Sequence, residues 1–229
     1  MRFVSTFLAC AFLVVPAAAQ VPSASIPEPK IEGGRLGAAY RPLVEQLRAG
    51  GLVLVFRHDR TATTGLWDYE PFTAGECDRQ RRLSPAGEES ARAIGQALRQ
   101  LDVPVTRVIA STYCRAIESA AFMFGGMHRA VPDLIGADGK GRTLETVRKE
   151  VIALMAREAD PAGVLVLVGH HGTTDAFTTR MLDEGDALIL RPGKNGASPA
   201  VLAHIPAARW EEIARDMDRE PVEKRRKRD

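Results

Sequence analysis

The sequence predicts a single α/β domain built as a three-layer sandwich, with a mostly parallel central sheet and helices on both faces. Short unbroken apolar runs alternate with longer segments of helical spacing, an order typical of parallel sheets covered on both faces. The length of 229 residues, with 45% hydrophobic and 26% charged residues, suits one domain with a sizeable core. The apolar runs also end abruptly in polar residues, and α/β folds bind their ligands at the carboxyl ends of strands.

The chain is expected to begin with a signal peptide at residues 1–19. Arg2 gives a positive start, an apolar run follows, and the residues up to Ala19 are small enough for cleavage. An uncleaved anchor and a lipid-modified Cys10 are the alternatives. The mature chain is expected to be periplasmic or secreted, with no transmembrane segment. The remaining parts are a flexible lead-in, the folded domain and a basic polar tail, at residues 20–39, 40–210 and 211–229.

Helices are predicted from apolar spacing and capping residues. The clearest begins at Pro85, because Ser84 is a good N-cap, proline suits the first turn, and apolar residues then recur at helical spacing to about Leu101. Thr143 similarly offers a cap for a helix that runs to Ala156. The other helices are expected over residues 40–49, 113–124 and 173–182, with some helix near the start of the tail.

Strands are predicted from short apolar runs. Leu52 to Phe56 is apolar throughout and indicates a strand buried on both faces. The polar stretch over residues 61–80 is long for a connection, which favours a functional loop. Residues 125–142 are rich in glycine and are expected to be irregular. The other strands are expected over residues 107–110, 163–168, 187–190 and 200–203.

The charge and the cysteines narrow the class of protein further. The formal net charge of +2 gives no reason to expect nucleic-acid binding, and the basic run Lys224–Arg228 is either a solvated tail or a contact for an anionic surface. Removal of the signal peptide would leave two cysteines, Cys77 and Cys114, an even number in an exported protein. A Cys77–Cys114 disulfide is therefore predicted, and two free buried thiols are the alternative.

Three predicted strands end in residues that suit phosphate chemistry. Arg57-His58 follows the first, Ser111 to Arg115 the second, and His170 the third. Because parallel strands end at the same edge, these residues should form one small pocket with two guanidinium groups and two imidazoles. Guanidinium groups bind phosphate oxygens in a bidentate way, and imidazole can act as a covalent nucleophile. Phosphoryl transfer needs little more than positioning and charge neutralisation.

These motifs resemble those of the histidine phosphatase superfamily, which includes cofactor-dependent phosphoglycerate mutases and many phosphatases. Arg57-His58 resembles its R-H-G motif, Ser111-x-x-x-Arg115 its second phosphate-binding segment, and Val168-Gly169-His170 its second-histidine motif. Gln80-Arg81-x-Leu83-Ser84-x-x-Gly87 resembles the stretch before its first long helix. The resemblance covers roughly residues 50–205. Among exported members, the chain resembles bacterial phosphatases that include the lipopolysaccharide core heptose phosphate phosphatases.

The resemblance implies that the domain is a metal-independent phosphatase without a cofactor. His58 would accept the phosphoryl group as a phosphohistidine, which water would then hydrolyse. Arg57 and Arg115 would hold the phosphate oxygens, His170 would stabilise charge during transfer, and Arg60 would add to substrate binding. The expected partner is a small phosphorylated substrate, such as a phosphorylated sugar or an envelope component.

Two positions depart from the family pattern. Asp59 stands where the family has glycine, and its carboxylate could repel phosphate, orient an imidazole or a water, serve as an acid, or turn away from the site. The family also places a carboxyl group after the second phosphate-binding segment to protonate the leaving oxygen. Here Asp133, Asp138 and Glu145 are available without a clear motif, and Asp138, flanked by glycine and alanine neighbours, is preferred.

Three alternatives to a histidine phosphatase differ in the residues that they need. A cysteine-dependent phosphatase needs several residues between its cysteine and arginine, whereas Cys114 is followed directly by Arg115. A non-catalytic protein that binds a phosphate ligand with the same fold is the main alternative function. A metal-dependent hydrolase would have to use a set of side chains with no recognised ligand spacing, namely His58, Asp59, His170, His171 and Asp175.

Overall fold

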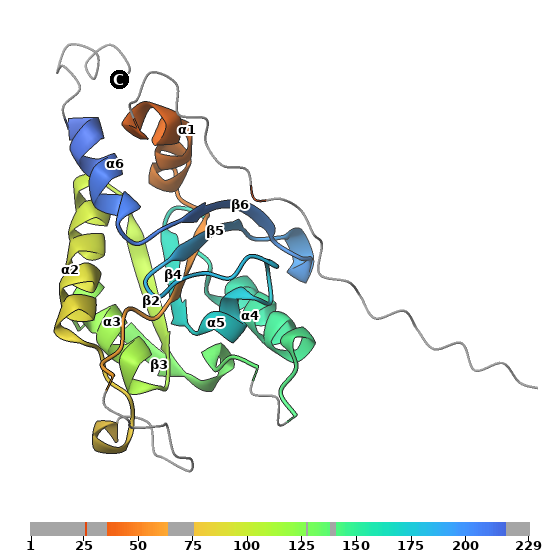
Figure 1. Ribbon diagram of the computed structural model, residues 1–229. Coiled ribbons are helices and arrows are strands. Elements are labelled where there is room, and N and C mark those ends of the chain that lie inside the picture. The colour runs from red at the N-terminus through yellow and green to blue at the C-terminus, as the bar shows by residue number, and fades with distance from the viewer. Residues whose placement is uncertain (1–25, 27–35, 64–75, 127, 138–140, 219–229) are drawn as a thin grey trace, which may run out of the picture.

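The computed structural model describes residues 26, 36–63, 76–126, 128–137 and 141–218. Within this part of the chain, six strands form one mixed sheet in the order β3-β2-β4-β1-β5-β6 (Figure 1). The strands β3, β2, β4 and β1 run parallel to one another. β5 runs antiparallel to β1, and β6 runs antiparallel to β5. The strands are β1 (Val53–Arg57), β2 (Val105–Ser111), β3 (His128–Val131), β4 (Val164–Gly169), β5 (Ala187–Arg191) and β6 (Ala200–Ile205).

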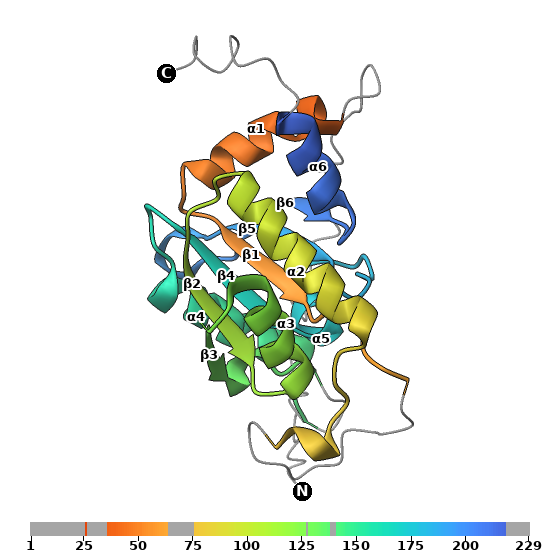
Figure 2. The ribbon, with the colours of Figure 1, turned by 90° about the vertical axis from the view of Figure 1, so that its left-hand side faces the viewer.

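Helices cover both faces of this sheet, which confirms the predicted three-layer α/β class. One face carries α1 (Leu36–Arg48), α2 (Pro85–Gln100), α3 (Cys114–Phe124) and α6 (Arg209–Asp218). Figure 2 looks onto this face, with α2 and α3 in front of the strands. The other face carries α4 (Leu144–Glu158) and the short α5 (His171–Thr174). Three 3₁₀ turns complete the described elements: η1 (Cys77–Arg79), η2 (Pro132–Leu134) and η3 (Lys194–Gly196).

The central strand β1 joins two hydrophobic cores. Leu54 and Phe56 are fully buried under α1, α2 and α6, and the Phe56 ring lies 6.2 Å from that of Trp210. Val53 and Val55 point to the opposite face, into the core beneath α4. The alternation along a strand therefore buries both of its faces, as the unbroken apolar run predicted. In the described part of the chain, no helix has the length and apolar character that a bilayer span requires.

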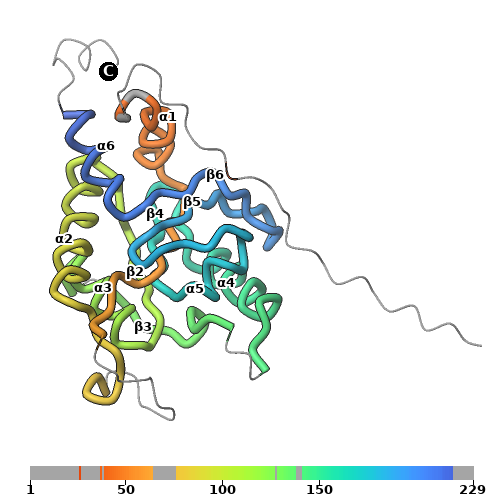
Figure 3. Tube along the Cα trace, viewed as in Figure 1, coloured from red at the N-terminus to blue at the C-terminus, as the bar shows by residue number. Residues whose placement is uncertain are grey.

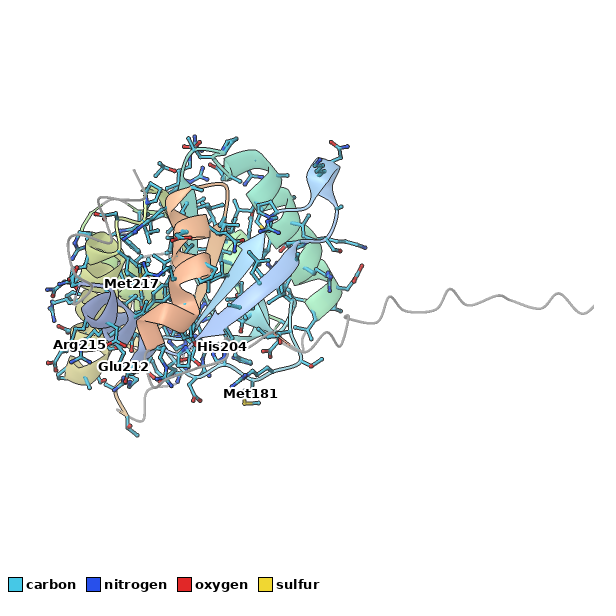
Figure 4. All side chains as sticks on the ribbon, turned by 90° about the horizontal axis from the view of Figure 1, so that it is seen from above. Met181, His204, Glu212, Arg215 and Met217 are labelled. Carbon is cyan, nitrogen blue, oxygen red and sulfur yellow. A yellow bond between two sulfur atoms is a disulfide. The ribbon has the colours of Figure 1, made fainter. Side chains whose placement is uncertain are left out.

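The folded domain extends beyond the predicted boundaries at both ends. α1 begins at Leu36, inside the predicted lead-in, and α6 covers the first part of the predicted polar tail. The two helices lie side by side although they come from opposite ends of the chain (Figure 3), and the Gly37 amide donates to the Asp216 carboxylate at 3.3 Å. Figure 4 shows Met217 and Arg215 on α6 beside α1. α6 confirms the helix expected near the start of the tail, and its buried stripe is narrow and set among charged residues.

Two further elements differ from prediction. β3 lies within the segment expected to be irregular, and it was missed because this edge strand is only partly buried and so lacks an apolar run. The helix expected over residues 173–182 ends after one turn at Thr174. Phe177 and Leu182 are nevertheless buried in the core beneath α4, so their spacing reflects the packing of a loop and not a helical period.

Candidate phosphate site

The carboxyl ends of β1, β2 and β4 meet at one edge of the sheet. β4 lies between β1 and β2, and all three run parallel. The His58 amide donates to the Gly169 carbonyl at 2.8 Å, which extends the β1–β4 pairing by one residue beyond the strand. This backbone bond fixes the start of the polar segment after β1 against the end of β4, where His170 follows. The predicted meeting of the strand ends is confirmed.

A cavity of about 220 Å³ opens at this edge. Four of the predicted site residues line it: Arg57, His58, Arg115 and His170. The other described residues that line it are Arg81, Tyr113, Ile135, Gly136, Ala137 and His171. Among these described residues the cavity has three guanidinium groups and no carboxylate, so its charge suits a compact anion.

His58 is held as a neutral imidazole. Its side chain is only 3% exposed, and its Nδ1 lies 2.9 Å from the Asp59 carbonyl oxygen. A carbonyl can only accept, so Nδ1 carries the proton and Nε2 carries the lone pair. Burial, followed by the charges of Arg115 and Arg57, lowers the pKa of His58 from 6.5 to about 3. The same cations that would attract an anion therefore keep this imidazole unprotonated at neutral pH.

His170 is oriented by the end of β2. Its Nε2 lies 2.8 Å from the Ser111 hydroxyl, and that hydroxyl oxygen accepts the Tyr113 amide at 3.4 Å. We assign the hydroxyl hydrogen to Nε2, which places the proton of the neutral imidazole on Nδ1. Burial, followed by the charge of Arg115, holds the pKa of His170 well below its usual value. His170 therefore offers an N–H donor beside His58.

Arg57 is anchored from the loop before β5. One guanidinium nitrogen donates to the Leu182 carbonyl at 2.7 Å, and another lies 3.7 Å from a Glu184 carboxylate oxygen. The same oxygen lies 3.8 Å from His58 Nδ1, and Glu184 also accepts from the Thr61 amide and hydroxyl at 3.3 Å. Glu184 was not predicted, because no local motif points to it. It places one negative charge beside Arg57, the last residue of β1, and His58, the residue after it.

Arg115 is positioned by contacts at the start of α3. Its guanidinium carbon lies 4.6 Å from the centre of the Tyr113 ring, in a cation–π contact. Its carbonyl accepts from the Ser119 hydroxyl at 2.7 Å, and the Ser119 oxygen accepts the Asp59 amide at 2.9 Å. Ser119 thus ties α3 to the segment after β1.

Asp59 is turned away from the cavity. Its side chain is fully buried, does not line the cavity, and accepts from the Arg60 amide at 2.7 Å. One of its oxygens would lie only 2.9 Å from a Cβ at Gly185, where φ is +89°, so glycine makes room for the carboxyl group. Burial raises the pKa of Asp59. Of the roles considered for Asp59, the structure favours a side chain packed outside the site and excludes direct service as the acid.

Arg60 does not lie in the predicted place. Its side chain is about half exposed and lines a separate cavity of about 320 Å³ between α2 and α6, so the expectation that it binds substrate is wrong. Asp138 lies outside the described residues. Asp133 and Glu145 form ion pairs with Arg157 and Lys149 and do not line the cavity.

The two remaining sequence hypotheses concern metal and sulfur. The described residues contain no group of three or more His, Cys, Asp or Glu side chains placed to hold a metal ion, so the set proposed for a metal-dependent hydrolase is not brought together. Cys77 and Cys114 form the predicted disulfide. The bond joins the turn η1 to the first residue of α3, directly beside the cavity, and it removes both sulfurs from nucleophilic chemistry.

Known proteins resemble this chain in structure, whereas the comparisons of sequence found no match. No family model matches the chain, and no curated protein matches it. The protein histidine phosphatase SixA, solved with tungstate, matches with a TM-score of 0.51 and 15% identity over 69% of this chain and 97% of that chain. A mutant phosphoserine phosphatase from Entamoeba histolytica, solved with phosphoserine, matches with a TM-score of 0.52 and 12% identity over 69% and 98%.

A third solved structure gives a similar match. YhfR from Bacillus stearothermophilus matches with a TM-score of 0.50 and 14% identity over 66% of this chain and 95% of that chain. These structural neighbours are members of the histidine phosphatase superfamily. The chain therefore has a phosphoglycerate mutase-like α/β fold, and the cavity at the ends of β1, β2 and β4 is the candidate site of that fold.

Proposed function

We propose that the chain is an exported, metal-independent phosphatase that hydrolyses a small phosphomonoester through a phosphohistidine on His58. The observation that carries this proposal is the state of His58: neutral, with Nδ1 tied to the Asp59 carbonyl and a lone pair on Nε2, beside guanidinium groups. A nucleophile must be unprotonated when an anionic substrate arrives. Burial and neighbouring cations meet this requirement here, since they hold the pKa of His58 at about 3.

The proposed reaction has two displacements at phosphorus. In the first, Nε2 of His58 forms a bond to phosphorus while the bond to the leaving oxygen breaks. In the second, a water oxygen attacks phosphorus, the bond to Nε2 breaks, and inorganic phosphate leaves. Arg57 and Arg115 would hold the phosphoryl oxygens, and the Nδ1–H of His170 would donate to one of them. All four side chains line the same cavity.

The leaving oxygen needs a proton, and Asp138 is the proposed donor. Asp138 directly follows Ala137 in the sequence, and Ala137 lines the cavity. The described residues that line the cavity include no carboxylic acid. Good leaving groups would depend little on this acid, whereas an alkyl phosphate would depend on it strongly.

The compartment and substrate are proposed from chemistry. The Cys77–Cys114 disulfide suits an oxidising compartment, which agrees with the signal-peptide pattern of residues 1–19. A cavity of about 220 Å³ is larger than a phosphoryl group, so it also has room for part of the group to which the phosphate is esterified. A phosphorylated sugar or another envelope component fits both conditions. Two of the structural neighbours are a protein histidine phosphatase and a phosphoserine phosphatase, which supports the activity class.

A non-catalytic phosphate-binding protein is the second candidate, because the described cavity has cations and no acid. Steady release of inorganic phosphate from p-nitrophenyl phosphate by the mature chain, unchanged by EDTA, is the result expected of the phosphatase. Tight binding of phosphate with no turnover would favour the binding protein. Loss of activity in EDTA that returns with a divalent metal would overturn metal independence.

A further inference from the structure

The segment that leads into Arg81 is attached to the start of α3 from two sides. The Cys77–Cys114 disulfide joins them, with Cα atoms 5.6 Å apart. Gln80 is 1% exposed, and its side-chain oxygen accepts the Cys114 amide at 3.0 Å while its side-chain nitrogen donates to the Glu76 carbonyl at 3.1 Å. A buried side chain with both of its polar ends bonded has little freedom to move. The position of the next residue, Arg81, is fixed accordingly.

Arg81 lines the same cavity as His58 and Arg115. Its charge lies close enough to lower the pKa of both His58 and His170, although Arg115 has the larger effect on each. The other arginines of this basic run face elsewhere. Arg82 pairs with Glu118, and Arg79 is exposed and does not line the cavity.

We propose that Arg81 is a third phosphate-binding cation of the site and that the Cys77–Cys114 disulfide holds it in place, so that reduction of the disulfide weakens binding of the phosphoryl group. The inference rests on the proposed function, because it concerns the same cavity. Arg57 reaches the cavity from β1 and Arg115 from α3. Arg81 comes from a loop, so its contribution depends on what holds that loop.

The anchors on the two sides of Arg81 differ in kind. On its C-terminal side, the Leu83 amide donates to Glu118 at 2.9 Å, and the Arg82 carbonyl accepts the Ala62 amide at 2.9 Å. On its N-terminal side the disulfide and Gln80 hold the segment. Reduction adds two electrons and two protons and turns the disulfide into two thiols. It therefore removes one of the two anchors on the N-terminal side of Arg81, while Gln80 still bonds to Cys114. The expected effect is a partial loss of affinity for phosphate.

The test measures binding, so it does not depend on turnover. Vanadate and inorganic phosphate would be titrated by calorimetry into the oxidised mature wild type, Arg81→Lys, Arg81→Ala and the matched control Arg79→Ala. Losing a charge-assisted bond predicts that Arg81→Ala binds roughly 10- to 100-fold more weakly, with Arg81→Lys between it and the wild type. Arg79→Ala should stay within twofold. Affinity within twofold of wild type for Arg81→Ala would remove Arg81 from the clamp.

The redox measurement repeats only the titration with inorganic phosphate, because thiols reduce vanadate. Dithiothreitol supplies the two electrons and two protons and closes to its own cyclic disulfide. The reduced wild type should bind several-fold more weakly, whereas reduced and oxidised Arg81→Ala should bind alike, because the disulfide acts through that side chain. An equal loss in both proteins would mean that the disulfide acts elsewhere. Unchanged affinity of the reduced wild type would also overturn the proposal.

Two further measurements allow the proposal to be tested even if the reduced chain unfolds. Circular dichroism reports whether the reduced chain stays folded. If it does not, oxidised Gln80→Met, which removes the bonds to Cys114 and Glu76 while keeping the disulfide, replaces reduction as the way to loosen the segment, and unchanged affinity there would overturn the positioning role. Phosphate binding that depends on Arg81, in a chain that releases no phosphate from p-nitrophenyl phosphate, would support this inference and reject the proposed phosphatase.

Discussion

The imidazole rings of His58 and His170 lie edge to face, with centroids 5.4 Å apart and planes inclined by 63°. Each ring is neutral, because burial and Arg115 lower both pKa values. Each also has one nitrogen bonded to a neighbour, the Asp59 carbonyl for His58 and the Ser111 hydroxyl for His170. The remaining nitrogens are complementary: His58 has a lone pair and His170 an N–H. Such a pair can attack phosphorus from one ring while the other donates to an oxygen.

His58→Asn should abolish turnover of p-nitrophenyl phosphate and the trapping of acid-labile phosphate on the protein. Asparagine keeps a polar side chain in this buried position but cannot serve as the nucleophile. His128→Asn, a change at the start of β3 away from the cavity, should keep activity within twofold. Thermal unfolding followed by circular dichroism would show that both variants fold. Turnover near the wild-type rate in folded His58→Asn would reject the phosphohistidine.

The low pKa of His58 predicts that the free energy of unfolding falls in mild acid. The unfolded chain binds a proton at His58 near pH 6.5, whereas the folded chain binds it only near pH 3. Between these values the unfolded state holds more protons, so stability declines by about 1.4 kcal/mol per pH unit as pH falls and is unaffected by His58 above pH 6.5. His170 acts in the same direction, and the raised pKa of Asp59 acts in the opposite one.

A comparison of variants separates His58 from these other groups. Urea unfolding at pH 7 and pH 5 would be measured for the wild type and His58→Asn. The wild type should lose roughly 2 kcal/mol more than the variant between these two pH values, since 1.5 pH units below 6.5 correspond to that free energy. The same loss in both proteins would show that His58 is not buried as a neutral ring.

The fold was predictable where local patterns and packing agree. The Ser84 hydroxyl accepts the Gly87 amide at the start of α2, as its capping pattern predicts, and β1 has both of its faces buried. β3 was not predicted, because an edge strand with exposed side chains has no apolar run. α6 was expected only as some helix near the start of the tail, because its buried residues, such as Trp210, stand among charges and pack only once α1 and α2 are in place.

The site was predictable where a residue directly follows a strand. Arg57, His58 and His170 needed only the rule that parallel strands end at one edge. Glu184 could not be predicted, because its contact with Thr61 joins residues 123 positions apart in the chain and comes from a loop without a motif. Arg81 stood in a recognised stretch, but its direction depends on the disulfide and on Gln80. Tertiary contacts, which spacing does not reveal, set both positions.

Gly95→Ala should destabilise the chain by roughly 1–3 kcal/mol or more, although alanine is normally favoured over glycine in a helix. A Cβ at Gly95 would lie 2.0 Å from the Met123 carbonyl oxygen, where α2 packs closely on α3, so the backbones would have to separate. Gly126→Ala is the matched control, because no atom lies within 4 Å of its Cβ position. Urea unfolding should leave this control within about 0.5 kcal/mol of wild type. An equally stable Gly95→Ala would contradict the close approach of the two helices.

Arg115→Lys and Arg115→Ala test the arginine clamp. Lysine keeps the charge but loses the planar fork that makes two parallel bonds to phosphate, and it also loses the stacking on Tyr113. A charge-assisted hydrogen bond contributes roughly 1.5–3 kcal/mol, so the loss of one predicts about a 10- to 100-fold lower kcat/KM for p-nitrophenyl phosphate. Arg115→Ala should lose more, and both variants should be inhibited less by vanadate.

Arg60→Ala is the control for those variants, because it removes the same charge close to the nucleophile but from a side chain that lines another cavity. Its kcat/KM and vanadate inhibition should stay within twofold of wild type. A large loss in Arg60→Ala, equal to that in Arg115→Ala, would show that the variants act through the general positive charge around the site. A loss in Arg115→Ala alone would locate the effect in the guanidinium group beside Tyr113, which lies in the same cavity as both histidines.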